Sequence, residues 1–294
     1  MKFEEIFAKR YYRILEEGNQ LIRNQMIGRG LSMAKLASSA GISESYAEHL
    51  IRNDRNFRED ELLKVLPLFQ LTISCDYFIP QNTIHGKFIN LPRKNSPELM
   101  RIVGYFLGDG NLQERSLRFK DTDKEVLKIY QKLIERVFNV KGRIVSQKET
   151  IAYLLEINSL YLRNWFQKNI TVRKREILEE IKQLSQRESV AFLRGIFDAE
   201  GYVAIQSRQI RLAITNQAIA KVLHYLLSRL GIGSSFYKIK RKEPNWSDIY
   251  LISLNNHLAF EKFSKFIGFS SKKKARRLDL LFKRKLNKSI NIIG

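Results

Sequence analysis

The sequence predicts an α+β fold in which two tandem copies of an αββαββα unit follow an all-α N-terminal domain. The first observation is that the helix and strand signals of residues 97–184 recur in the same order in residues 185–282. The second is a likeness between individual residues, since YLLEIN at 153–158 corresponds to YLISLN at 250–255. The third is that residues 1–80 carry helix and turn signals alone.

Within the N-terminal domain, residues 1–28 predict a first helix, and a helix-turn-helix follows it. Ser32 and Ser43 can each cap a helix, and Gly41 between them supplies a permissive turn. This segment resembles repressor-type helix-turn-helix domains. The residues that we assign to partner contact on its second helix are Ser45, His49 and Arg52.

Helix-start signals set the remaining boundaries. Ser96 followed by Pro97 predicts the start of the first repeat, and the capping box formed by Ser185 and Glu188 predicts the start of the second. The expected domain bounds are a proline-containing linker at 81–96, a first repeat at 97–184, a second repeat at 185–282 and a basic tail at 283–294.

The charge indicates a polyanionic partner, because the formal net charge is +22. Residues 1–80 contain 11 Lys+Arg and 11 Asp+Glu, so the whole surplus lies in residues 81–294. The neutral N-terminal domain gives no sign of strong phosphate binding; added base contacts, regulation of the protein's own gene and protein binding all stay open. Basic residues that alternate along strands favour nucleic acid over a membrane surface.

Other classes of site and location are disfavoured. The single cysteine, Cys75, excludes disulfides within the chain and thiolate metal sites, and the four histidines lack metal-binding spacing. No apolar run approaches the roughly 20 residues that span a bilayer. The opening MKFEEIFAKR lacks the apolar centre of a secretory signal. We therefore expect a cytoplasmic protein, associated with the nucleoid in a prokaryotic host.

Two matching motifs carry the chemistry. The helix of each repeat ends in a small residue, an acid and a glycine, as GYFLGDG at 104–110 and GIFDAEG at 195–201. Small residues four apart on one helical face let two helix backbones approach closely. An acid in the last turn of a helix is destabilising by about 0.3–1 kcal/mol. Either motif alone could be an ordinary helix end, but two in register indicate a functional site.

If the two motif helices pack side by side, the carboxylates of Asp109 and Glu200 meet at one end of the pair. Their repulsion then requires a counter-charge. Hard oxygen ligands suit a divalent cation, and we expect Mg²⁺ or Mn²⁺.

GYFLGDG and GIFDAEG resemble the paired motifs of single-chain LAGLIDADG homing endonucleases, with the resemblance extending over about residues 97–280. It implies two repeats around a pseudo-twofold axis that form a basic saddle over double-stranded DNA. The last acids, Asp109 and Glu200, would bind the catalytic metals, with Gly108 and Ala199 beside them. One departure is that the first motif has Leu107 where the second has Asp198.

The implied activity is hydrolysis of one phosphodiester in each strand at a long asymmetric target, by a monomer without an obligate protein partner. The family also uses one basic residue late in each repeat. Lys174 and Lys274 are the candidates, and the alternatives are Lys272, Lys273 and Arg173.

Strand alternation predicts the DNA-contacting residues, because side chains two apart share one face of a strand. Lys and Arg suit phosphates and guanine, and Gln suits adenine. The expected contacts are Arg118, Lys120, Lys141, Arg143 and Gln147 in the first repeat, and Gln206, Arg208, Gln209, Arg211, Lys238, Lys240 and Lys242 in the second.

Two other functions stay open. The helix-turn-helix is compatible with a non-cleaving transcription regulator built on the same fold, although both acids are retained. An RNA splicing maturase is also compatible with the sequence. An intein ancestry is conceivable, but the length leaves no room for a splicing domain.

Overall fold

The computed structural model describes residues 11–55, 57–71, 78–81, 89–92, 94–147, 150–241 and 247–290. The chain forms two compact units, Ile6–Asn90 and a larger one from Leu91 onward, so their boundary falls inside the expected linker at 81–96. None of the described helices is long and apolar enough to cross a membrane.

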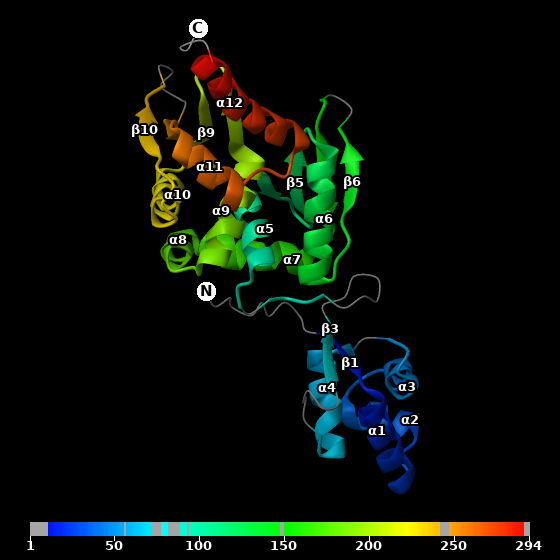
Figure 1. The fold of residues 1–294 in the computed structure, drawn as a ribbon. Helices are drawn as coiled ribbons and strands as arrows, with labels where there is room; N and C mark the ends of the chain where they lie inside the picture. Colours follow the sequence, from blue (N-terminus) through cyan, green and yellow to red (C-terminus); the bar gives the residue numbers. More distant parts are fainter. Residues whose placement is uncertain are drawn as a thin grey trace. The chain divides into compact units, whose positions relative to one another are not determined.

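The smaller unit combines four α-helices with a three-stranded antiparallel sheet of order β2-β1-β3 (Figure 1). Its elements are β1 (Tyr11–Ile14), α1 (Glu16–Gly28), α2 (Met33–Ala40), α3 (Glu44–Arg52), β2 (Phe57–Arg58), α4 (Glu59–Val65), the 3-10 turn η1 (Leu66–Phe69) and β3 (Phe78–Gln81).

The prediction of an all-α domain is therefore wrong. In the described part of the expected helix at 1–28, Tyr11–Ile14 form β1 and α1 begins at Glu16. Tyr12 and Ile14, two apart, are both buried, which is the period of a strand with one covered face. The pairing partners of β1 lie at 57–58 and 78–81, so this strand depends on contacts distant in sequence.

The predicted pair of helices around Gly41 is present as α2 and α3. The hydroxyl of Ser32 accepts a hydrogen bond from the Lys35 N–H, and that of Ser43 from the Tyr46 N–H, each at 3.2 Å. Gly41 has φ of +61°, a left-handed conformation that glycine adopts without steric cost. Leu36 and Leu50 are fully buried. The sequence thus specifies both the caps and the turn of this pair.

The larger unit contains the two repeats. The first consists of α5 (Pro97–Asp109), β4 (Gly110–Leu112), β5 (Leu117–Asp121), α6 (Lys124–Phe138), β6 (Arg143–Ser146), β7 (Tyr153–Ile157) and α7 (Leu160–Phe166), followed by the π-helix η2 (Gln167–Val172) and α8 (Lys174–Lys182). The second consists of α9 (Gln186–Glu200), β8 (Gly201–Ala204), β9 (Gln209–Ile214), α10 (Gln217–Arg229), β10 (Ser235–Ile239), β11 (Ile249–Leu254) and α11 (His257–Phe266), followed by α12 (Lys272–Ile290).

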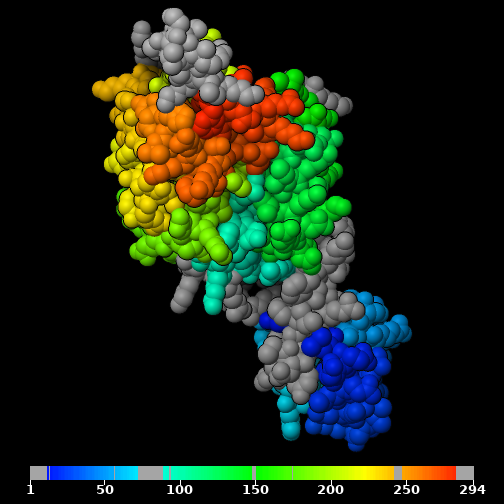
Figure 2. All heavy atoms as spheres, in the orientation of Figure 1, coloured from blue at the N-terminus to red at the C-terminus, as the bar shows by residue number. Residues whose placement is uncertain are grey.

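Each repeat forms a four-stranded antiparallel sheet, with order β4-β5-β7-β6 in the first and β8-β9-β11-β10 in the second. The two orders are equivalent, which confirms the predicted tandem αββαββα architecture. α12 extends the helical structure into the segment expected as a tail. Figure 2 shows α11 and α12 side by side on one face of this unit, in orange to red.

Candidate active site at the paired helix ends

The two motif helices, α5 and α9, form the most extensive contact between any two described elements and lie side by side in Figure 1. A Cβ added to Gly104 would collide with the carbonyl oxygen of Phe192, and one added to Gly195 would collide with that of Arg101. At Gly108 an added Cβ would lie 2.6 Å from the Ala199 Cβ. The stripe of small residues therefore serves close helix packing, as the sequence predicts.

Each helix passes directly into a strand at its terminal glycine. Gly110 and Gly201 have φ of −82° and −76°, so neither adopts a left-handed conformation. Glycine is required there by crowding instead, because an added Cβ would strike the side chain and carbonyl of Phe106 or of Phe197. These glycines fix the ends of both helices and so the positions of Asp109 and Glu200, the residues just before them.

The carboxylates of Asp109 and Glu200 are partly buried, and neither accepts a hydrogen bond from any residue that the structure describes. Burial, together with the charge of Asp121, raises the pKa of Asp109. Burial and then the charge of Asp109 raise the pKa of Glu200 to about 7. The two acids therefore disfavour each other's ionised form, which is the electrostatic signature expected of a carboxylate pair.

Lys274 of α12 lies beside this pair. Its ammonium donates to the carbonyl oxygens of Asp198 at 2.5 Å and Ala199 at 3.2 Å, at the carboxyl end of α9. Burial lowers the pKa of Lys274, while the nearby carboxylates, those of Asp109 and Glu200 among them, oppose that shift. A cation at the negative end of a helix is also favourable.

Of the other basic candidates, the structure describes the side chains of Lys272, Lys273 and Arg173. Lys272 and Lys273 are exposed on α12. Arg173 forms ion pairs with Glu176 at 3.5 Å and Glu180 at 3.0 Å along α8. Lys174 is the first residue of α8, and its side chain lies outside the part that the structure describes.

Asp121, at the end of β5, is not among the residues predicted from the sequence. Its carboxylate accepts hydrogen bonds from the Tyr105 hydroxyl at 2.7 Å and from the Asp123 N–H at 2.8 Å. Its charge contributes to the raised pKa of Asp109, so the two carboxylates lie near each other. β5 of the first repeat corresponds to β9 of the second, and the pairing of each with its neighbouring strand makes Asp121 equivalent to Ile214. Aligning the two repeats would therefore have identified an acid that is present in one of them alone.

The donor set fits a hard divalent cation. Among the described residues no group of three or more His, Cys, Asp or Glu side chains could hold a metal ion. The carboxylates of Asp109 and Glu200 would be the two side-chain ligands at this site. Mg²⁺ is commonly held by one or two carboxylates, with water and substrate phosphate oxygens completing its shell. The carbonyl of Ala199, expected near the metal, accepts a hydrogen bond from Lys274.

In the first sheet, the predicted alternation is confirmed on β5, where Leu117 and Phe119 are buried while Arg118 and Lys120 are more exposed. Glu156 of β7 accepts hydrogen bonds from Arg118 Nε at 2.8 Å through one oxygen and from Arg143 Nε at 2.9 Å through the other. These two arginines lower the pKa of Glu156. Lys141 is exposed before β6, and Gln147 directly follows β6.

In the second sheet, β9 alternates as predicted, with Gln209 and Arg211 on the more exposed face. Lys238 and Lys240 are exposed, and Lys238 pairs with Asp248 at 2.7 Å. The expectation that Gln206 and Arg208 share a strand face is wrong. β8 ends at Ala204 and both residues lie in the following turn, where Arg208 has φ of +51°. Lys242 lies outside the described residues.

On α3 of the smaller unit, Ser45 is exposed, and the two basic candidates have acidic partners. His49 Nδ1 lies 2.8 Å from Asp54, and Arg52 lies 3.6 Å from Glu48. These ion pairs weaken the attraction of α3 for phosphate.

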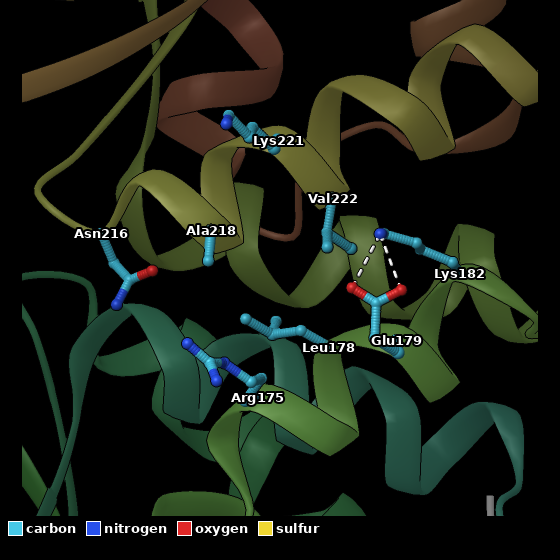
Figure 3. Close-up of a pocket in the computed structure, with 8 residues that line it drawn as sticks. All are labelled: Arg175, Leu178, Glu179, Lys182, Asn216, Ala218, Lys221 and Val222. Atoms are coloured by element: carbon cyan, nitrogen blue, oxygen red, sulfur yellow. Dashed lines mark hydrogen bonds and ion pairs between the residues drawn. The ribbon is translucent and has the colours of Figure 1, made fainter.

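A pocket between α8 and α10 is separate from the paired acids (Figure 3). Leu178, Ala218 and Val222 supply its apolar lining, and polar groups from both helices surround it, with Glu179 and Lys182 paired at 2.8 Å. None of the residues predicted to act in catalysis or DNA contact lines this pocket.

Comparison with known proteins places the chain among relatives of similar sequence. It is 33% identical over 289 residues to the glutamine–fructose-6-phosphate aminotransferase (isomerizing) of Methanocaldococcus jannaschii, matching 96% of this chain and 26% of that protein. It is 28% identical to a probable translation initiation factor IF-2 of Thermococcus kodakarensis, matching 87% of this chain and 22% of that protein. The chain thus spans about a quarter of the length of these curated relatives.

Among solved structures, it is similar to I-DmoI in complex with DNA and Mn, at 21% identity and a TM-score of 0.43, covering 58% of this chain and 96% of that one. It is also similar to full-length DUF199/WhiA from Thermatoga maritima, at 15% identity and a TM-score of 0.47, covering 69% of this chain and 68% of that one.

The family profile of the LAGLIDADG-like domain matches residues 96–171 and 187–268, one match in each repeat. Together the two matches cover more than half of the 294 residues. Each match includes a motif helix, its terminal acid and the four strands of that repeat. The chain therefore belongs to the LAGLIDADG-like domain family.

Proposed function

We propose that the protein is a site-specific endonuclease that hydrolyses one phosphodiester in each strand of duplex DNA, using a divalent cation. The observation that carries this proposal is the pairing of Asp109 and Glu200. Burial and then the charge of Asp109 raise the pKa of Glu200 to about 7, and neither carboxylate accepts a hydrogen bond from a described residue. Such an arrangement is unfavourable for the fold alone and is consistent with a site for metal.

Bound at these carboxylates, a divalent cation supplies Lewis-acid chemistry, polarising the phosphate and lowering the pKa of the attacking water. The remaining roles in the proposed reaction belong to side chains of the protein. Asp109 and Glu200 hold the ion, one from each repeat. Lys274 places a cation beside the position where the phosphate charge develops. Asp121, held by Tyr105, adds a hydrogen-bond acceptor on the first-repeat side for orienting water.

The cationic sheet faces support DNA as the substrate. Arg118, Arg143 and Arg211 lie on strands of both sheets. Lys120 is exposed on β5, and Lys240 is exposed directly after β10. The chemistry of these side chains suits phosphates and guanine edges. Because the two repeats differ in sequence, we propose that one chain acts as a monomer on an asymmetric target.

The matched relatives also support a self-contained module. An aminotransferase and an initiation factor share no chemistry by name, yet this chain matches both over most of its length and about a quarter of theirs. We infer that a segment shared by proteins of such different names has a function of its own, as a protein encoded by a mobile DNA element would. We propose that the α2–α3 pair adds contacts to DNA, although its ion pairs make its contribution to affinity small.

The test is cleavage of a randomised duplex library in Mg²⁺ or Mn²⁺ by the wild-type chain and by the Asp109→Asn/Glu200→Gln double variant. Glu179→Gln/Glu261→Gln, which removes two exposed acids from α8 and α11, is the control for the changed net charge. We expect double-strand cuts at a long consensus with the wild type and the control, and none with the double variant. Sequence-selective retention of DNA without cutting by any of the three would contradict the endonuclease and support a DNA-binding regulator. Preferential binding of structured RNA in competition would support a maturase.

A further inference from the structure

Two adjacent serines connect the start of α12 to both repeats. Ser270 precedes the helix and contacts Asp198 of α9, and Ser271 contacts Asp123 at the start of α6. Asp198 belongs to the second repeat and Asp123 to the first. The segment that leads into α12 is therefore held where the repeats meet.

Asp198 is fully buried, and both oxygens of its carboxylate accept hydrogen bonds. One oxygen accepts from the Ser270 N–H at 2.7 Å. The other accepts from the Tyr130 hydroxyl at 2.8 Å, from the Ser270 hydroxyl and from Arg101 Nη2 at 3.3 Å. A buried carboxylate is tolerated when it is paired and hydrogen-bonded in this way, and such networks hold one arrangement rigidly.

Asp123 makes the second attachment. One of its oxygens accepts from the Glu125 N–H at 3.1 Å, capping α6, and the other accepts from the Ser271 hydroxyl at 2.8 Å. The Ser271 hydroxyl in turn accepts from the Lys274 N–H at 3.4 Å. The same serine thus caps α12 and binds the first repeat.

Lys274 lies in the first turn of α12, so the position of that turn determines where its ammonium points. The ammonium donates to the carbonyls of Asp198 and Ala199, directly beside Glu200. The basic side chains of Lys272, Lys273, Arg276 and Arg277 face solvent, whereas Ala275 is partly buried and Leu278 is buried one turn after Lys274. The attachments at Ser270 and Ser271 are the side-chain hydrogen bonds that hold the start of the helix, next to Lys274.

We propose that Asp198 and Asp123 are positioning residues that hold the start of α12 and thereby aim Lys274 at the paired acids. The first motif has Leu107 where the second has Asp198, so only the second repeat can make the buried half of this attachment. The catalytic consequence rests on the proposed endonuclease function. The attachment itself is a property of the DNA-free protein and is tested separately.

The first experiment measures the acylation rate of each lysine in the DNA-free full chain by mass spectrometry, with an amine-reactive ester at fixed pH. The variants are Asp198→Asn and Ser271→Ala, and Ser271→Thr is the conservative variant because it keeps the hydroxyl. Ser189→Ala is the matched control, since it removes a buried hydrogen bond from the other end of α9. Lys272 and Lys273 serve as internal references.

We expect Lys274 to be protected in the wild type, in Ser271→Thr and in the control, and to react severalfold faster in Asp198→Asn and Ser271→Ala. The reference lysines should react at unchanged rates. Equal protection of Lys274 in every variant would overturn the proposal. If Asp198→Asn does not fold, Ser271→Ala and Tyr130→Phe still decide the question, because the first removes the bond to Asp123 and the cap at the Lys274 N–H, and the second removes a donor that holds Asp198.

The second experiment separates binding from chemistry on a cleavable target. We expect single-turnover cleavage to slow by roughly ten- to a hundredfold in Asp198→Asn and Ser271→Ala, with DNA affinity unchanged and with recovery in Ser271→Thr. A loss of affinity with an unchanged cleavage rate would overturn the positioning role. If the wild type does not cut at all, the proposed function fails, whereas the acylation result still stands or falls alone.

Discussion

Glu156 of β7 and Ser253 of β11 occupy the same position in the two repeats, and each lies opposite an arginine of the adjacent strand. Glu156 pairs in register with Arg118, and Ser253 pairs in register with Arg211. Glu156 holds two arginines through its two oxygens, whereas Ser253 offers only a hydroxyl. The first sheet therefore presents two oriented, partly neutralised arginines, and the second presents an arginine whose charge has no carboxylate at the matching position.

The first prediction concerns base selectivity. A guanidinium whose orientation is fixed can contact a guanine edge with two hydrogen bonds, while a mobile one contacts phosphates without regard to sequence. We expect Glu156→Gln to raise affinity for nonspecific DNA, and to broaden base preference at positions facing the first sheet. Target selection from a randomised library measures both effects. Glu179→Gln removes an equal charge far from the strands in sequence and should change neither; unchanged selectivity in Glu156→Gln would refute the orienting role.

A second prediction distinguishes two neighbouring lysines by salt dependence. Lys238 is paired with Asp248 at 2.7 Å, whereas no such partner of Lys240 is found among the described residues. If Lys240 contacts one phosphate, Lys240→Ala should lower the slope of log affinity against log salt by about 0.9. Lys238→Ala should lower it less, because Asp248 already offsets that charge. Titrations of a duplex target at several salt concentrations give both slopes, and equal slopes in the two variants would contradict this difference.

The sequence predicts much of the fold because its signals are local. Alternation along β5 and β9 places Arg118 and Arg211 on the correct face, and serine caps mark where α2, α3, α5 and α9 begin. The paired acids are predictable because two features that disfavour a helix, an interior glycine and an acid in the last turn, occur at matching positions in both motifs.

What the sequence does not predict depends on contacts between distant residues. Asp198 and Ser270 are 72 positions apart, and Asp123 and Ser271 are 148 apart. The strand β1 forms only because residues 57–58 and 78–81 pair with it. The turn that removes Gln206 and Arg208 from β8 has a left-handed Arg208 where no glycine signals a change of direction.

A third prediction tests the close packing of α5 and α9. Gly195→Ala would place a methyl group against the carbonyl of Arg101 and 2.8 Å from the Tyr105 N. Backbone atoms cannot move aside as a side chain can, so we expect a loss of about 1–3 kcal/mol of unfolding free energy. Trp165 is buried in the larger unit, so tryptophan fluorescence in denaturant reports the unfolding of that unit. Gly233→Ala is the control, since its added Cβ would lie 3.4 Å from Asn256 Nδ2, and it should unfold like the wild type.

The last prediction follows from the raised pKa of Glu200, which is about 7 in the folded protein. An unfolded glutamate has a pKa of about 4.3, so between these values the folded state binds more protons than the unfolded state. The free energy of unfolding must then fall as pH rises through this window. We expect Glu200→Gln to be more stable than the wild type by about 1–3 kcal/mol near pH 8 in EDTA, with little difference near pH 5. Adding Mg²⁺ near pH 8 should stabilise the wild type more than the variant, because the ion binds the folded carboxylates.

Denaturant unfolding followed by tryptophan fluorescence measures all of these differences. If the two proteins differed equally at both pH values, burial and the charge of Asp109 would not raise the pKa of Glu200, and the case for a metal at this pair would lose its electrostatic basis.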